Sequence, residues 1–461
     1  MTEQQLGSLT LALLLIVGVA TGLGHLFSRW RQPRVVGEIL AGVVLGPTVL
    51  GHLAPSFSHS LFGAGRTATP AVVLDFLYQV GLLLLLFVSG VEVRRVFATR
   101  TSRRQTWWLL GVGTSLPFML TLALSPIIPL HSLMGPVGNR ASLLLVLATA
   151  AAVTSIPVIS KIFADLGILR TRFAGLVLGV AMLEDIALYG VLAVATTLAA
   201  AAAGSAGSNL VRDIAVHVVV TSAFMVAGLT VVPTLLSRIG RSRFNPLAKT
   251  SPLAWMLIVL LAYTSIAAAL DVKVIFGAFL AGFGLVGGFK GTERERIARP
   301  AEAITSVSFA LFIPVYFAMV GFRLNLARTF SLGLLVAFLV GSTILRLCSA
   351  GLAARLAGFR KLDIVNIAVT ANARGGPGIV LATVAFDAGI VSAPFFTALV
   401  VTAVLTSQLA GLWLDRVLRK GWPLLSGAGA DEDDEVAPVV APHGPDGLNG
   451  AALPAVAGKT A

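Results

Sequence analysis

Apolar runs of about twenty residues recur along most of this chain, and they restrict its fold more than any other feature of the sequence. A run of that length, folded as a helix, crosses a hydrocarbon layer roughly 30 Å thick. The composition agrees, because 56% of the 461 residues are hydrophobic and 12% are charged, whereas a soluble domain carries about 25% charged residues. We therefore expect an all-α polytopic membrane protein in a lipid bilayer.

Charged and Pro- or Gly-rich breaks divide these runs into thirteen predicted spans. Only a polar patch at Asp271 and Lys273 separates the eighth span from the ninth, so twelve or fourteen spans remain possible. Residues 426–461 are rich in Gly, Ala and Pro, with one acidic cluster, and such a segment cannot build a core. We expect a membrane transport domain over residues 1–425 and a disordered cytoplasmic tail over residues 426–461. The predicted spans cover residues 6–28, 34–52, 70–92, 106–130, 141–166, 170–203, 212–239, 252–270, 272–288, 302–324, 329–357, 363–388 and 392–419.

The net charge of +13 is explained by membrane topology rather than by a nucleic-acid partner. Cytoplasmic loops of membrane proteins retain Lys and Arg. With the N-terminus outside and the C-terminus in the cytoplasm, the cytoplasmic segments hold 26 of these residues and the outer loops hold 6. This topology predicts a multi-pass protein of the cell (inner) membrane. The single cysteine, Cys348, excludes a disulfide framework and a cysteine metal site, and no cofactor is expected.

Two pairs of similar segments indicate an internal repeat. Residues 39–47 in the second span resemble residues 277–288 in the ninth, and residues 85–94 in the third resemble residues 315–325 in the tenth. Both pairs are seven spans apart, and an odd offset inserts the second copy upside down relative to the first. The sequence therefore predicts two inverted six-helix repeats joined by the seventh span.

Helix-breaking residues occur in the fifth and twelfth spans, which are also seven spans apart. The fifth contains Thr154, Ser155 and Pro157, and the twelfth contains the run Gly-Gly-Pro-Gly at 375–378. We expect both spans to unwind locally, although a simple kink is the alternative for either span alone. Unwound backbone inside a membrane can line a wet cavity and hold ions. Thr154 and Ser155 would then supply hydroxyl and carbonyl oxygens to a cation.

Two adjacent acids, Glu184 and Asp185, lie midway along the sixth span, close to the broken fifth span. An ionised side chain at the centre of a bilayer costs roughly 2.5 to 3.5 kcal/mol, so such residues are usually paired or functional. Neighbours on a helix point about 100° apart. We expect one acid to face the broken helices and the other to meet Arg346 or Arg374, the arginines within predicted spans. The alternative is that both acids are structural ion-pair partners.

Three further acids, Glu38, Asp75 and Glu92, lie near the ends of predicted spans. Charges at that depth can reach the membrane interface. We therefore expect these acids to pair with nearby arginines there rather than to bind an ion.

Six motifs together resemble the monovalent cation:proton antiporters, closest to the cation:proton antiporter-2 type with the sodium/proton antiporter fold. The resemblance covers about residues 6–420. It implies that spans 4–6 and 11–13 form a core with crossed broken helices, which moves against a dimerisation domain in a homodimer. It also implies that Asp185 binds the cation and the proton in turn. The motifs are VGEILAGVVLGP (36–47), GLLLLLFVSGVEV (81–93), TSIPVISKI (154–162), EDI (184–186), GAFLAGF (277–283) and NARGGPGIVLA (372–382).

The chain departs from the family pattern in two places. Members with two aspartates and a lysine in span 11 are typically electrogenic, and members with Asn-Asp and an arginine there are typically electroneutral. Here Glu184 precedes Asp185 and Arg346 stands where the lysine would be, so the type is mixed. In span 12, Arg374 matches a family motif whose acid is replaced by Gly378, so we expect no ion ligand at that glycine.

The predicted function is secondary active antiport of a monovalent cation against protons; we expect the cation to be Na⁺, with K⁺ or Li⁺ as alternatives. Coupling would arise because the cation and the proton compete for Asp185, and an elevator-type movement would carry the occupied site across the membrane. A sodium-coupled symporter of an organic anion is the alternative, but it would need a larger polar cavity. A channel and a membrane sensor are further alternatives, and enzymatic activity is not expected.

Overall fold

The computed structural model describes residues 3–30, 33–62, 69–96, 103–155, 158–159, 162–163, 166–168, 171–204, 210–242, 245–287, 292–324 and 326–425. These residues form helices joined by short connections, and the only β-type pairing among them is one antiparallel bridge between Met134 and Val391. Nine helical runs in the described chain are long and apolar enough to cross a membrane. The all-α class is therefore confirmed, whereas the number thirteen is not.

The predicted spans outside these nine runs consist of shorter, bent or broken helices. The fifth span begins with α9 (Arg140–Ala152) and the ninth contains α16 (Val274–Gly287), which are 13 and 14 residues long. In the seventh span, α12 (Leu210–Thr230) and α13 (Val232–Arg241) meet at a bend of 48°. The twelfth is divided into α21 (Leu362–Ala371) and α22 (Gly375–Asp387). A count of long straight helices therefore falls short of the predicted number of spans.

Two π-helical turns interrupt otherwise continuous helices. The turn η1 (Leu109–Thr114) joins α6 to α7, and η2 (Ser308–Phe312) joins α17 to α18. The remaining helices are α1 (Glu3–Arg29), α2 (Arg34–Leu45), α3 (Leu50–Leu53), α4 (Pro55–Phe62), α5 (Thr69–Val96), α6 (Arg103–Trp108), α7 (Ser115–Ala123), α8 (Leu130–Leu133), α11 (Arg172–Gly204), α14 (Leu247–Thr250), α15 (Pro252–Ala269), α17 (Thr292–Val307), α18 (Ile313–Arg323), α19 (Leu326–Thr329), α20 (Leu332–Leu356) and α23 (Ala393–Arg419).

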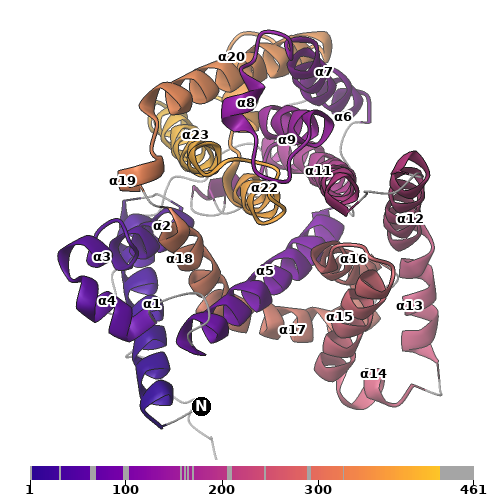
Figure 1. Cartoon of the computed structure of the whole chain (residues 1–461). Coiled ribbons are helices and arrows are strands. Elements are labelled where there is room, and N and C mark those ends of the chain that lie inside the picture. The colour runs from indigo at the N-terminus through magenta and orange to yellow at the C-terminus, as the bar shows by residue number, and fades with distance from the viewer. Residues whose placement is uncertain are drawn as a thin grey trace, which may run out of the picture.

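The helices gather into two bundles (Figure 1). The first bundle consists of α1–α5 and α12–α18, where α5 packs on α16 and α2 packs on α18. The second bundle consists of α6–α9, α11 and α20–α23, where α20 packs on α21 and α22 packs on α23. The helix α11 of the second bundle also contacts α5 and α12 of the first. Each bundle thus combines one segment from the first half of the chain with one from the second half.

Glycines bring α2 and α18 of the first bundle into backbone contact. A Cβ atom added to Gly42 would lie 1.7 Å from the carbonyl oxygen of Ala318, and one added to Gly321 would lie 1.9 Å from the carbonyl oxygen of Ile39. No side chain fits at such distances, so this close approach depends on the two glycines.

The same contact recurs between α5 and α16. A Cβ atom on Gly282 would lie 2.0 Å from the carbonyl oxygen of Phe87, and one on Gly90 would lie 2.1 Å from that of Phe279. In all four cases, the glycine of one helix lies against a backbone carbonyl oxygen of the partner helix. That carbonyl belongs to the residue three positions before the partner helix's own glycine. The four helices contain the four segments of the predicted repeat, which therefore pair in a reciprocal pattern.

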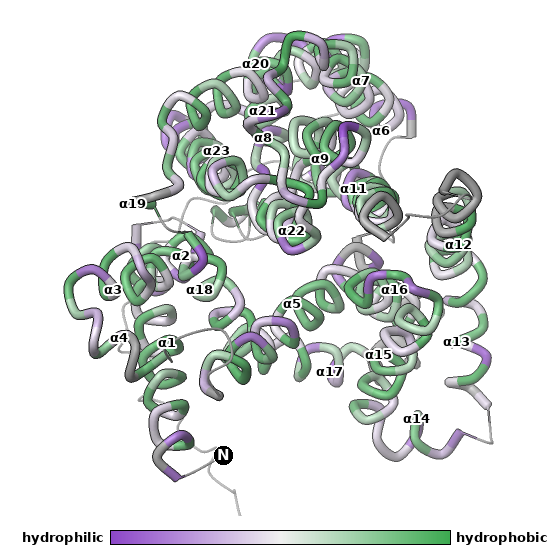
Figure 2. The backbone as a smooth tube through the Cα atoms, viewed as in Figure 1, coloured by the Kyte–Doolittle hydropathy of each residue, from purple (hydrophilic) through white to green (hydrophobic). Residues whose placement is uncertain are grey.

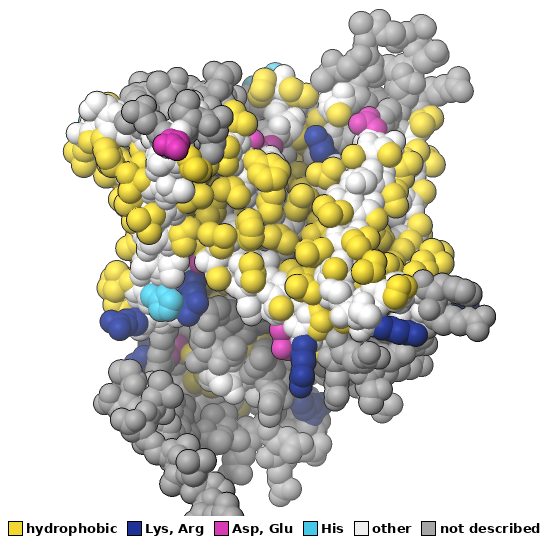
Figure 3. Space-filling model, turned by 90° about the horizontal axis from the view of Figure 1, so that it is seen from below, with side chains coloured by type: hydrophobic (Ala, Val, Ile, Leu, Met, Phe, Trp, Pro, Cys, Tyr) yellow, Lys and Arg dark blue, Asp and Glu magenta, His cyan; other side chains and the backbone are white. Residues whose placement is uncertain are grey.

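The outer surface is apolar where a bilayer would surround it. Figure 2 shows hydrophobic residues along most of the long helices and hydrophilic residues mainly at helix ends, connections and a few other helices such as α14 and α17. Figure 3 shows a band of hydrophobic side chains across one face, with the described Lys and Arg side chains gathered mainly along one rim. Large apolar side chains on this surface are well exposed, such as Leu14 at 68% and Leu261 at 64%. Such a surface suits lipid rather than water.

Candidate ion-binding site

The fifth and twelfth predicted spans are both interrupted, and their interruptions lie against each other. The helix α9 ends at Ala152, and Val153 is already extended. The backbone N–H of Ser155 donates to the carbonyl oxygen of Ala373 at 2.8 Å. The hydroxyl of Thr154 donates to the carbonyl oxygen of Ala371, the last residue of α21, at 2.6 Å. Each break therefore satisfies part of the other's polar backbone, which a membrane interior requires.

The twelfth span breaks just before its glycines. Gly375 has a φ of +36°, which favours glycine, and a Cβ atom there would lie 2.3 Å from a methyl carbon of Val158 and 2.7 Å from the hydroxyl oxygen of Ser155. Pro377 lies in the first turn of α22, where its missing N–H removes no helical hydrogen bond. Pro157, the predicted breaker of the fifth span, lies outside the described residues.

The deepest ion pair joins Glu184 of α11 to Arg346 of α20. Arg346 Nη2 is 2.6 Å from Glu184 Oε1, and the two side chains are 1% and 0% exposed, in that order. The same guanidinium donates to the hydroxyl of Thr154 at 2.5 Å, to the carbonyl oxygen of Gly113 at 2.6 Å and to that of Ala371 at 3.1 Å. The sequence left open which arginine meets Glu184, and the structure shows that it is Arg346. The expectation that one acid faces the broken helices while the other meets an arginine is wrong, because Glu184 does both.

Glu184 accepts two further hydrogen bonds. The backbone N–H of Thr154 donates to Oε2 at 3.0 Å, and the hydroxyl of Thr114 donates to Oε1. Thr114 and Gly113 lie in η1, and π-helical turns inside α-helices occur frequently at functional sites. Sequence reasoning missed both residues. The available signal was the stretch LLGVGT at 109–114, which places a threonine and two glycines within an apolar span.

Asp185, the predicted ion ligand, is fully buried and lies on another face of α11. It interacts electrostatically with Tyr189, one turn further along the same helix. The ring of Tyr189 packs 4.6 Å from the ring of Phe279 in α16 of the first bundle. Residues four apart share a helix face, so Asp185 lies on the side of α11 turned toward the first bundle, whereas Glu184 faces the interior of the second.

Thr154 and Ser155, the predicted oxygen ligands, are both buried at the crossing. The hydroxyl of Thr154 donates to Ala371 and accepts from Arg346, so it faces the buried ion pair. The hydroxyl of Ser155 accepts from the backbone N–H of Val158 at 3.4 Å. Their role as cation ligands stays a prediction.

Arg374, the second predicted counter-charge, is 3% exposed. Its Nη1 donates to the hydroxyl oxygen of Ser342 at 2.7 Å, and its Nη2 donates to the side-chain oxygen of Asn372 at 3.4 Å. Its guanidinium carbon (Cζ) lies 5.6 Å from the centre of the Phe338 ring. None of the described carboxylates forms an ion pair with it. An arginine over an aromatic face is partly compensated by the ring, so Arg374 is held without an acid among the described residues.

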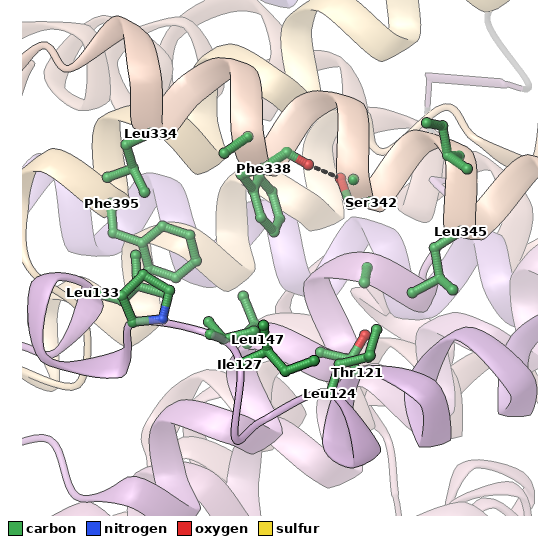
Figure 4. A pocket seen from close by; sticks show the side chains of 16 residues that line it. Thr121, Leu124, Ile127, Leu133, Leu147, Leu334, Phe338, Ser342, Leu345 and Phe395 are labelled. Carbon is green, nitrogen blue, oxygen red and sulfur yellow. Dashed lines mark hydrogen bonds between the residues drawn. The ribbon is translucent and has the colours of Figure 1, made fainter.

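An apolar cavity of about 530 Å³ lies beyond Ser342 (Figure 4). Its walls come from α7, α9, α20 and α23 and the segment that follows α7, and Leu147 and Phe395 belong to them. The lining residues Ile127 and Ile344 are 79% and 56% exposed on the apolar outer surface. This cavity therefore faces lipid, and it is not the polar chamber that an organic anion would need.

Comparison with known proteins identifies the family. A model described as "Sodium/hydrogen exchanger, transmembrane" matches residues 11–420. The chain is 28% identical over 408 residues to the Na(+)/H(+) antiporter NhaS4 of Synechocystis sp., with 86% of this chain and 93% of that relative covered. It is 26% identical over 392 residues to the Na(+)/H(+)-K(+) antiporter GerN of Bacillus cereus, with 84% and 90% covered.

The chain is also 28% identical over 322 residues to the Cation/H(+) antiporter 18 of Arabidopsis thaliana, of which it spans 37%. The sodium proton antiporter MjNhaP1 from Methanocaldococcus jannaschii shares its fold, with a TM-score of 0.56, 13% identity, and 90% of this chain and 98% of that one covered. The predicted resemblance is confirmed, because the family model matches most of the chain. The chain is a multi-pass membrane protein of the sodium/hydrogen exchanger family.

Proposed function

We propose that the chain is a secondary active antiporter that exchanges a monovalent cation for protons, with Na⁺ as the preferred cation and K⁺ or Li⁺ as alternatives. One observation carries this proposal: two adjacent buried acids have separate surroundings, since Arg346 holds Glu184 while Asp185 lies on another face of α11. The printed activities of the relatives support it, because they are antiporters of Na⁺ or K⁺ and protons.

Asp185 is the residue that takes the cation and the proton in turn. Glu184 is paired with Arg346, so the proposal assigns the exchange to Asp185. Competition for one carboxylate couples the two fluxes, because a cation can bind only after the proton leaves. Thr154 and Ser155 are proposed as further oxygen ligands of the cation, as the sequence predicts, because hard cations prefer oxygen. In the arrangement described, the Thr154 hydroxyl faces the Glu184–Arg346 pair, so this role requires Thr154 to turn toward the cation.

The second bundle is proposed to move against the first in an elevator-type cycle. Both breaks and the Glu184–Arg346 pair lie within the second bundle and hold one another, which supports its movement as one unit. An Asp185 that is charged and holds neither ion would oppose the movement, since moving a charge through hydrocarbon is costly. The first bundle is proposed to be the dimerisation part of a homodimer, as the family resemblance implies.

The predicted topology also enters as a proposal. Thirteen spans in two inverted repeats are supported by the reciprocal glycine contacts of α2 with α18 and of α5 with α16. A cytoplasmic C-terminus and an outer N-terminus are supported by the distribution of charge in the sequence, because this topology places 26 Lys and Arg residues in cytoplasmic segments and 6 in outer loops.

The test is proton flux in proteoliposomes that contain a pH-sensitive dye. After a pH gradient is imposed, addition of Na⁺ is expected to dissipate it, and K⁺ and Li⁺ are compared at equal concentration. Asp185→Asn removes the titratable ligand but keeps its shape, so it should abolish the exchange while the purified protein still elutes as a folded species. A folded wild-type protein that dissipates no gradient with any of the three cations would overturn the proposal. Na⁺ flux that depends on an added organic anion would favour the symporter instead.

A further inference from the structure

A second charged cluster connects the two bundles, away from the buried acidic pair. Arg323, the last residue of α18, donates through Nη1 to Asp387 at 2.5 Å and through Nη2 to Asp75 at 2.8 Å. The hydroxyl of Tyr78 donates to the other oxygen of Asp387 at 2.8 Å. Asp387 ends α22 of the second bundle, whereas the other three residues belong to the first. The expected pairing of Asp75 with an arginine is thereby confirmed.

Aromatic residues fix the arginine in place. The guanidinium carbon (Cζ) of Arg323 lies 4.0 Å from the centre of the Tyr78 ring. Tyr78 is fully buried and stacks on Tyr316 with ring centres 5.4 Å apart. The hydroxyl of Tyr316 donates to that of Thr383 in α22 at 3.3 Å. The helices α5 and α18 therefore make two polar contacts with α22, one buried and one at the surface.

The surface contact lines a cavity of about 1,130 Å³ between the bundles. Its walls contain Asp75 and Arg323 from the first bundle and Asp387 from the second. Without a partner, the charged Asp387 would be destabilised at this position, because the helix dipole disfavours a carboxylate at the C-terminal end of a helix. The Asp387 carboxylate is therefore stabilised there by the guanidinium of Arg323, which the first bundle supplies.

We propose that Arg323, Tyr78 and Asp387 form a latch, which holds the two bundles in the arrangement described and opens in each transport cycle. This inference rests on the proposed function, because it requires the bundles to move against each other. The contact suits repeated opening, since partly exposed ion pairs contribute little free energy. The Glu184–Arg346 pair differs, because it lies within one bundle and a buried pair is costly to break.

Asp75 completes the latch as the resting partner of the arginine. It lies on α5 in the same bundle as Arg323, so that pair persists when α22 moves away. The side chain of Asp387 is 32% exposed and lines the cavity, so water can solvate it there. Neither charge is left buried and unpaired when the latch opens.

The test compares two thiol bridges that use the same arginine position. Both variants start from Cys348→Ala, which removes the only cysteine of the chain. The first adds Arg323→Cys and Asp387→Cys, which bridge the two bundles; the control adds Arg323→Cys and Asp75→Cys, which bridge two helices of the first bundle. A short bifunctional reagent that a reductant can cleave joins the thiols in proteoliposomes, and mass spectrometry of the linked peptides measures completeness.

The bridge from position 323 to position 387 is expected to stop cation–proton exchange, and reductant is expected to restore it. The control bridge should leave the rate equal to that of its unbridged form. If the wild-type chain and Cys348→Ala both show no exchange, the proposed function fails. If Cys348→Ala exchanges, and exchange continues in the fully bridged 323–387 variant or stops equally in the control, the latch is wrong. Failure of the reagent to join 323 to 387 also overturns it.

A second measurement decides the case in which the 323–387 variant is inactive before bridging. The bridging rate between 323 and 387 should then change when Na⁺ is added, because an opening latch separates the thiols for part of the time. The bridging rate between 323 and 75 should not change. Equal behaviour of the two pairs contradicts the latch.

Discussion

At the scale of single residues, the two adjacent acids of α11 have different surroundings. Glu184 is bound by Arg346, by the hydroxyl of Thr114 and by the backbone N–H of Thr154. Arginine remains protonated under all relevant conditions, and charge-assisted hydrogen bonds are among the strongest in proteins. Glu184 is therefore held firmly in place, and the proposed function assigns the exchange of charge to Asp185.

The buried pair makes a prediction about stability. Arg346→Gln should destabilise the protein by roughly 3 to 5 kcal/mol, because it leaves Glu184 as an uncompensated buried charge. The double variant Glu184→Gln with Arg346→Gln should recover part of that loss, because no charge is left unpaired. Thermal unfolding of the detergent-purified proteins measures both. A double variant less stable than Arg346→Gln would show that the carboxylate is not stranded by the single change.

The charged residues of the site could be read from the sequence, but their partners could not. Glu184, Asp185, Arg346 and Arg374 stand out because a charge within an apolar run is costly and therefore rare. Two of the four partners of Arg346 are the backbone carbonyls of Gly113 and Ala371, a group that every residue carries. Their positions depend on the π-helical turn and on the crossing of two distant breaks.

At the scale of helices, the sequence predicted which spans break but placed one break slightly wrong. The run at 375–378 was expected to unwind, yet α22 begins at Gly375 and includes Pro377 in its first turn. The interruption covers residues 372–374 instead. Proline opposes a helix in the interior but is tolerated at its start, so the same residues that predict a break also begin the next helix.

The close helix pairs lead to a prediction with a matched control. Gly42→Ala should lower the free energy of unfolding by roughly 1 to 3 kcal/mol, the usual cost of overpacking, because α2 and α18 must separate to admit a Cβ atom. Gly282→Ala should have a similar effect if the two contacts are copies. In Gly341→Ala the added atom meets nothing within 4 Å, so stability should be kept. Equal melting temperatures for Gly42→Ala and Gly341→Ala would contradict this packing.

At the scale of the whole molecule, the sequence could not predict where the two bundles meet. Asp387 and Arg323 are 64 positions apart and lie in different bundles. Asp75 was expected to find an arginine at the interface, but Asp387 carries no local signal as the last residue of an apolar helix. Periodicity and charge define each helix by itself, whereas contacts between bundles depend on the arrangement of all of them.

The last prediction concerns the charge moved in one transport cycle. If Glu184 stays bound to Arg346 throughout, only Asp185 gains and loses charge, so one proton exchanges for one monovalent cation and no net charge crosses. If Glu184 also released a proton, two protons would exchange for one cation, and each cycle would move one charge, worth roughly 2.3 kcal/mol per 100 mV. The four hydrogen bonds donated by the Arg346 guanidinium favour the first case. We therefore expect electroneutral exchange.

The measurement is the exchange rate of Na⁺ or Li⁺ in proteoliposomes under an imposed potassium-diffusion potential, with Asp185→Asn vesicles as the background. A rate that changes steeply with voltage, and reverses at a two-to-one gradient ratio, would show instead that Glu184 titrates as well.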